Sequence, residues 1–70
     1  MTRDEWITDF AGRLGVEPPS AEEVEAILDL AAIAAHASER TAAPIACWVG
    51  GRAGRSLVEL REAARAIDPG

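Results

Sequence analysis

The stretch Ser20–Arg40, SAEEVEAILDLAAIAAHASER, decides the fold, because it predicts a long helix that is apolar over most of its circumference. At about 100° per residue, its apolar side chains form one broad face that extends around the side of the helix. These side chains are Val24, Ile27, Leu28, Leu30, Ala31, Ile33, Ala34, Ala35 and Ala37. A helix of this kind needs neighbours on most sides, so we expect it at the centre of a helical bundle.

The same stretch opens with a capping box, S/T-x-x-E, formed by Ser20 and Glu23, and this start signal recurs at Thr2 and at Ser56. In a capping box the hydroxyl accepts from the N–H three residues on, and the glutamate accepts from the N–H of the cap. A further helix is expected between the last two boxes, where Pro44 stands at a first-turn position. We therefore predict an all-α, small four-helix bundle in a single domain over residues 1–70, with helices near 3–14, 21–39, 44–53 and 57–67 and the second helix central.

Residue types also predict the connections and the core. Gly15 and Gly54 stand where helices commonly end in the left-handed conformation. Pro18–Pro19 forms a stiff connector, since two prolines cannot continue a helix. Trp6 and Trp48 are expected in the core, as bulky fillers among many alanines.

Composition argues against several classes of function. The formal net charge is −5 and all seven basic residues are arginine, so we expect no nucleic-acid binding, which depends on clustered positive charge. One cysteine, Cys47, and one histidine, His36, are too few for a disulfide or a zinc site of such ligands. A chain of 70 residues has little core to spare for a substrate cleft, so we expect no enzyme, no metal site and no cofactor.

The apolar segments are short. No apolar run approaches the ~20 residues that span a bilayer, and the first residues include Arg3, Asp4 and Glu5 in place of the apolar region of a secretory signal. We therefore expect no membrane segment and a cytoplasmic protein.

The polar residues of the central helix gather within about 100° of one another; they are Glu22, Glu25, Asp29, His36, Glu39 and Arg40. Asp29 and His36 are seven residues apart, about 10.5 Å along the helix axis. This separation is unsuited to a catalytic pair or a shared metal, because helical chelation uses spacings of three or four residues. Two interpretations remain: a solvated face, and a docking surface made of Asp29, His36 and Arg40 with Pro44 in the adjoining turn.

The segment 50–56, GGRAGRS, offers an alternative site. Arg52, Arg55 and Ser56 precede a helix start, and helix N-termini bind anions. However, no strand precedes the segment and the lysine of a P-loop is missing. The other interpretation is that the glycines allow close helix packing. Ser56 also faintly resembles the attachment serine of acyl carrier proteins, but only fourteen residues follow it.

Five short motifs carry a resemblance to a known family. They are Asp4-Glu5-Trp6-Ile7, Leu28-Asp29-Leu30-Ala31, Ala35-His36, Arg40-Thr41-Ala42-Ala43-Pro44 and Gly51-Arg52-Ala53-Gly54. With these motifs the chain resembles a small actinobacterial helical domain family of unknown function, found alone or appended to molybdenum cofactor guanylyltransferases. Thr41 stands where that family typically has proline directly after the arginine, which affects the turn.

The resemblance implies family-typical positions at Asp29, His36, Arg40 and Pro44. The leading hypothesis is therefore a non-enzymatic interaction or accessory module that serves molybdenum cofactor biosynthesis. Its expected partner is a guanylyltransferase or a second copy of this chain. The alternative is a small-ligand or anion-binding domain that uses the loop of Arg52, Arg55 and Ser56.

Overall fold

The structure, a computed structural model that describes residues 1–68, places 74% of these residues in helices. In chain order the helices are α1 (Arg3–Leu14), α2 (Ala21–Ala37), α3 (Ala42–Ala53) and α4 (Leu57–Arg65). Residues 1–68 contain no strand. The predicted all-α fold with four helices is confirmed.

All three capping boxes form as predicted, with both of their hydrogen bonds. In α1 the N–H of Glu5 donates to the Thr2 hydroxyl over 3.1 Å, and the N–H of Thr2 donates to the Glu5 carboxylate over 2.8 Å. Ser20 and Ser56 make the same pairs of bonds at the starts of α2 and α4. Gly15 and Gly54 have φ angles of 72° and 69°, so both left-handed helix ends are confirmed as well.

Three helix boundaries differ from the prediction. Helix α2 ends at Ala37 and not at residue 39, because Ser38 leaves the helical conformation while its hydroxyl donates to the carbonyl of Ala34. Helix α3 begins two residues before Pro44, because Thr41 already has helical angles and leads the chain into the helix without a side-chain cap. Helix α4 ends at Arg65, where the last turn tightens, with the N–H of Ile67 bonded to the carbonyl of Ala64.

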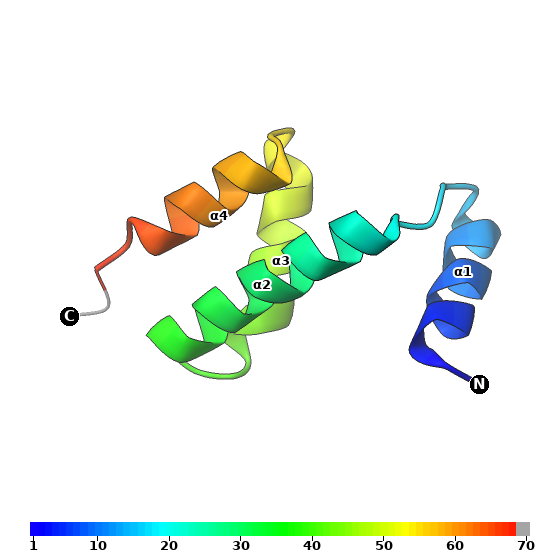
Figure 1. The fold of residues 1–70 in the computed structure, drawn as a ribbon, viewed down its shortest axis with the longest axis horizontal. Coiled ribbons are helices and arrows are strands. Elements are labelled where there is room, and N and C mark those ends of the chain that lie inside the picture. The colour runs from blue at the N-terminus through cyan, green and yellow to red at the C-terminus, as the bar shows by residue number, and fades with distance from the viewer. Residues whose placement is uncertain (69–70) are drawn as a thin grey trace.

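Helix α2 is central, as predicted. It makes the main interhelical contacts, with α3 and with α4, whereas α1 has no comparable contact with another helix. Figure 1 shows α3 and α4 beside α2 and α1 beyond its N-terminal end, joined to it by the connector of residues 15–20. Within the described chain the buried apolar residues are Ala11, Ala26 and Leu30. Ala11 is in α1, whereas Ala26 and Leu30 are both in α2, so most of the buried core lies on α2, which α3 and α4 contact.

A glycine sets how closely α3 approaches its neighbours. A Cβ atom added at Gly50 would lie 3.0 Å from Cδ1 of Leu60 and 3.6 Å from Cδ2 of Leu30. The adjacent Gly51 has no atom within 4 Å of the same added atom. Of the two glycines that were expected to permit close packing, Gly50 does so in this chain and Gly51 does not.

Two predictions about the core are wrong. Trp6 is 53% exposed and Trp48 is 63% exposed, although both were expected inside. Leu28 of α2 is also 50% exposed, so the open surface of α2 is wider than a narrow polar strip. The reason is that α1 does not close over α2, and that α3 turns its small residues inward and its tryptophan outward.

Candidate docking surface

Helix α3 presents large apolar side chains to solvent. Ile45, Trp48 and Val49 are all exposed, and their spacing of three and four residues places them on one side of the helix. We call these three residues the α3 outer face. The guanidinium of Arg52 lies 4.8 Å from the centroid of the Trp48 ring, a cation–π contact that holds the ring at the edge of this face.

The opposite side of α3 explains this orientation. Ala43, Ala46, Cys47 and Gly50 recur at three-, four- and seven-residue spacing and are half-buried or buried. Small residues let two helix backbones approach closely, so this side packs against α2, and at Gly50 it also comes close to Leu60 of α4. The large apolar residues are consequently left on the outside, where Arg52 lies over the Trp48 ring and Ile45 and Val49 are exposed.

Helix α1 carries a second apolar face. Trp6, Phe10 and Leu14 stand at four-residue intervals and are exposed. The rings of Trp6 and Phe10 stack with their centroids 5.1 Å apart and an angle of 27° between their planes. We call these three residues the α1 face. Ile7 beside them is half-buried, and it lines a small hollow with Pro19 and Val24 near the start of α2.

Asp29, the first residue of the predicted docking surface, is engaged within the chain. Its Oδ2 atom accepts hydrogen bonds from Arg65 over 2.9 Å and from Arg61 over 3.3 Å, both from α4. The Asp29 side chain is 41% exposed. Asp29 therefore links α2 to α4 through two ionic contacts. Residue spacing within α2 does not predict these contacts, because the two arginines belong to another helix.

The other residues of the predicted docking surface are exposed. His36 is near the end of α2, Arg40 is in the turn that follows, and Pro44 is in the first turn of α3. We call His36, Arg40 and Pro44 the turn strip. These residues lie close together along the chain and continue into the α3 outer face at Ile45.

The residues of the alternative anion site already have partners. Arg52 lies over Trp48, and Arg55 forms an ion pair with Glu59 over 3.4 Å. The Ser56 hydroxyl accepts from the N–H of Glu59, whose carboxylate in turn occupies the N-terminal end of α4. An external anion would have to displace this carboxylate.

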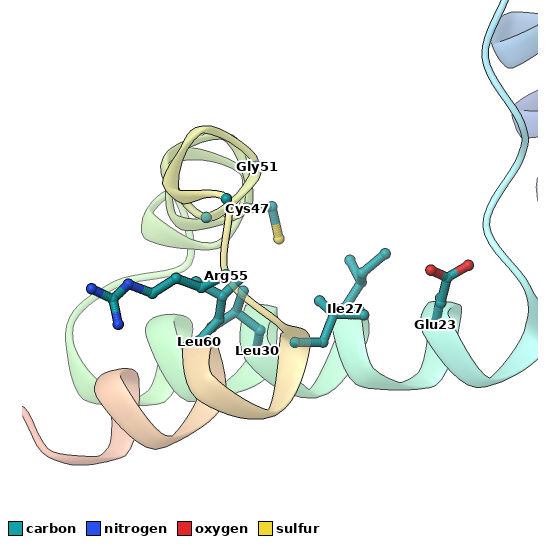
Figure 2. Close-up of a pocket in the computed structure, with 10 residues that line it drawn as sticks. Glu23, Ile27, Leu30, Cys47, Gly51, Arg55 and Leu60 are labelled. Carbon is teal, nitrogen blue, oxygen red and sulfur yellow. The ribbon is translucent and has the colours of Figure 1, made fainter.

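A hollow of about 330 Å³ lies between α2, α3 and the start of α4. Figure 2 shows Ile27 of α2 and the sulfur of Cys47 of α3 at this hollow, while the Arg55 guanidinium extends away from Glu23. Its lining is mainly apolar, and no pair of charged side chains converges in it. Throughout residues 1–68, no group of three or more His, Cys, Asp or Glu side chains is arranged to hold a metal ion.

Sequence reasoning missed the α3 outer face because it assigned both tryptophans to the core. A signal for this face is nevertheless present in the sequence. The small residues of α3 share one side, and Ile45, Trp48 and Val49 share the other. Some helices of small bundles carry small residues on one side and large apolar residues on the other. If the side with the small residues packs closely against its neighbours, the side with the large residues is predicted to stay exposed.

Comparison with known protein families matches residues 1–69 to a family described as a domain of unknown function (DUF6457). The chain belongs to this family. No similar protein is found among curated proteins or among solved structures. No helix in the described part of the chain is long and apolar enough to cross a membrane.

Proposed function

We propose that this domain is a non-enzymatic protein-interaction module. The observation that carries the proposal is the pair of unpartnered helix faces, the α1 face and the α3 outer face. A monomeric protein rarely exposes large contiguous apolar patches, and such patches commonly mark interaction sites. Tryptophan and arginine, which stand together on α3 as Trp48 and Arg52, are also the residues that most often dominate the binding energy of interfaces.

We further propose a molybdenum cofactor guanylyltransferase as a partner. The support is the resemblance to domains appended to such enzymes, which places family-typical residues in the turn strip. This domain and a guanylyltransferase can be joined in one chain or can dock as separate chains. The same contacts between the two proteins serve in both arrangements. The turn strip supplies a cation at Arg40 and an imidazole at His36, which suit orientation of a protein partner more than raw affinity.

The test is a calorimetric titration of the purified chain with the guanylyltransferase of the same organism. We expect one chain to bind per enzyme site, and we expect the double change His36→Ala and Arg40→Ala to weaken binding by about tenfold, since an exposed charge at Arg40 and an exposed imidazole at His36 contribute up to ~1 kcal/mol each. Val58→Ala is the matched control, because Val58 is exposed on α4 away from the turn strip. Absence of binding at ~100 μM, or equal binding by the double variant and the control, would contradict the proposal.

The anion-binding alternative has weaker support. Arg52, Arg55 and Ser56 are engaged with Trp48 and Glu59. Glu59 already supplies negative charge at the N-terminal end of α4, which is where an anion would gain most from the helix dipole. The interaction module therefore stands as the single proposed function.

A further inference from the structure

We infer that a second copy of this chain covers both apolar faces, with the α1 face of each copy packed on the α3 outer face of the other. The two contacts are equivalent and related by a twofold axis, which is the commonest symmetry of homo-oligomers. This inference rests on the proposed interaction function and names the occupant of its apolar surfaces. It leaves the turn strip free for a different protein.

The chain exposes more surface than a compact monomer of its mass. The chain exposes 5532 Å², whereas a compact monomer of this mass exposes about 4,200 Å². The excess is about 1,300 Å² per chain, so covering it in a dimer would bury about 2,600 Å² in total, within the range of about 2,000–5,000 Å² that obligate homodimers bury. The excess belongs to the whole chain, and an interface formed from all of it would have the size that a stable dimer needs.

The position of α1 leads to the same inference. The radius of gyration is 12.9 Å, against about 11 Å for a compact chain of this length. The connector that follows α1 is stiff: Gly15 is left-handed, the N–H of Val16 bonds back to the carbonyl of Ala11, and Pro18–Pro19 fixes the next backbone angles. Because this connector holds α1 away from α3, another chain is better placed to cover the α1 face.

Charge distinguishes the possible pairings. Helix α1 contains three acidic residues and two arginines, for a net charge of −1. Helix α3 contains no acidic residue and one arginine, Arg52, for a net charge of +1. The flanking arginines add little to this charge, because Arg40 follows Glu39 and Arg55 is paired with Glu59. Pairing α1 with α1, or α3 with α3, would place like charges together. Pairing α1 of one copy with α3 of the other places opposite charges together, which favours that register.

The mass of the purified wild-type chain is the first test. Sedimentation equilibrium should give twice the 7.4 kDa mass of the chain at micromolar concentration. A single species of monomer mass up to ~100 μM would overturn the dimer. That result would leave the proposed function standing if the same monomer still bound the guanylyltransferase in the titration above, so the two failures are distinguishable.

The second test uses the intrinsic fluorescence of the wild-type chain and needs no substitution. Its two tryptophans, Trp6 and Trp48, belong to the two faces that the dimer would cover. Tryptophan emission should therefore shift to longer wavelength on dilution, in step with the loss of dimer mass. A chain that sediments as a dimer but shows the same emission before and after dissociation would place the interface elsewhere and overturn the inference.

The third test is complementation between variants. Trp48→Glu breaks the α3 outer face, and the double change Trp6→Glu and Phe10→Glu breaks the α1 face. Each variant alone should raise the dimer dissociation constant at least about 30-fold, as truncation of a central tryptophan does. A mixture of the two contains one intact α1–α3 contact per heterodimer, so mixing should restore association in part.

Homotypic contacts would give the opposite result. If α3 packed on α3, the α1 variant would still dimerise and mixing would restore nothing. Val58→Glu is the matched control, because it adds the same charge at an exposed valine outside both faces and should leave the dissociation constant unchanged. Circular dichroism of each variant verifies folding, and if a variant unfolds, the wild-type mass and fluorescence still decide the inference.

Discussion

Helices α1 and α4 begin alike but pack differently. Each opens with a complete capping box, and α1 has in addition a left-handed glycine at its C-terminal end. Yet the shorter α4 packs on α2, with Leu57, Leu60 and Ala64 half-buried, while the α1 face stays exposed. The contrast shows that capping chemistry decides where a helix starts, and that it carries no information about the surface on which the helix lies.

Substitution of Leu30, on the side of α2 that α3 and α4 cover, should cause the largest loss of stability. Leu30 is 5% exposed at the place where α3 and α4 meet α2, so Leu30→Ala should lower the free energy of unfolding by about 2–5 kcal/mol. Leu28→Ala on the same helix should cost only about 1 kcal/mol, because that side chain is already half exposed. Denaturant unfolding at one fixed chain concentration measures both. Equal losses would mean that the α1 side of α2 is as well packed as the α3 side.

The second prediction compares two aspartates, Asp29, whose ion pairs join two helices, and Asp9, whose ion pair lies within α1. Asp29→Asn removes the charge that Arg61 and Arg65 contact, and it should cost about 1 kcal/mol, discounted because Asp29 is partly exposed. Asp9→Asn removes only the exposed pair with Arg13 and should cost under ~0.5 kcal/mol. Thermal unfolding in low and in high salt measures both. An Asp29 effect no larger than that of Asp9 would show that α4 is held by apolar contact alone.

The third prediction uses the neighbouring glycines of α3. Gly51→Ala should stabilise the chain by about 0.5–1 kcal/mol, because alanine is the better helix former and the added methyl group meets no atom within 4 Å. Gly50→Ala should lack this gain, since its methyl group would press on Leu60. A matched gain at both positions, measured by denaturant unfolding, would show that α3 and α4 are not closely packed in solution.

The smallest effect concerns the start of α1. The pKa of Glu5 lies below its usual value, mainly because the backbone N–H of Thr2 donates to the Glu5 carboxylate. The Thr2 hydroxyl lowers this pKa by a smaller amount. A carboxyl group whose pKa is lower in the folded state stabilises the helix above its unfolded pKa, and this contribution is lost as the pH falls through the folded value. Helicity of α1 should therefore decline slightly below about pH 4.5. Glu5→Gln keeps a capping side chain without titrating, so a difference in acid response between the two chains isolates this bond.

The predicted parts of the fold share a local cause. A capping box uses atoms three residues apart, and a left-handed glycine uses one residue, so both can be recognised in a short window of sequence. The end of α2 was predicted wrongly because Ser38 ends the helix with a hydrogen bond from its side chain to a backbone carbonyl. The start of α3 was predicted wrongly because Thr41 leads into the helix without a side-chain cap. The exposure of His36, Arg40 and Pro44 was predictable from the sequence. The engagement of Asp29 with α4 and the exposure of Trp6 and Trp48 were not.

The sequence by itself determined four helices, their starts, and the central place of α2, because backbone hydrogen bonding and helical periodicity are local properties. Only the tertiary structure decided which side of each helix is covered. Asp29 meets Arg61 and Arg65 from residues more than thirty positions away, and Trp48 faces outward because Gly50 brings α3 close to Leu60. Such outcomes depend on complementary shapes and charges between distant segments, which apolar spacing within one helix does not encode.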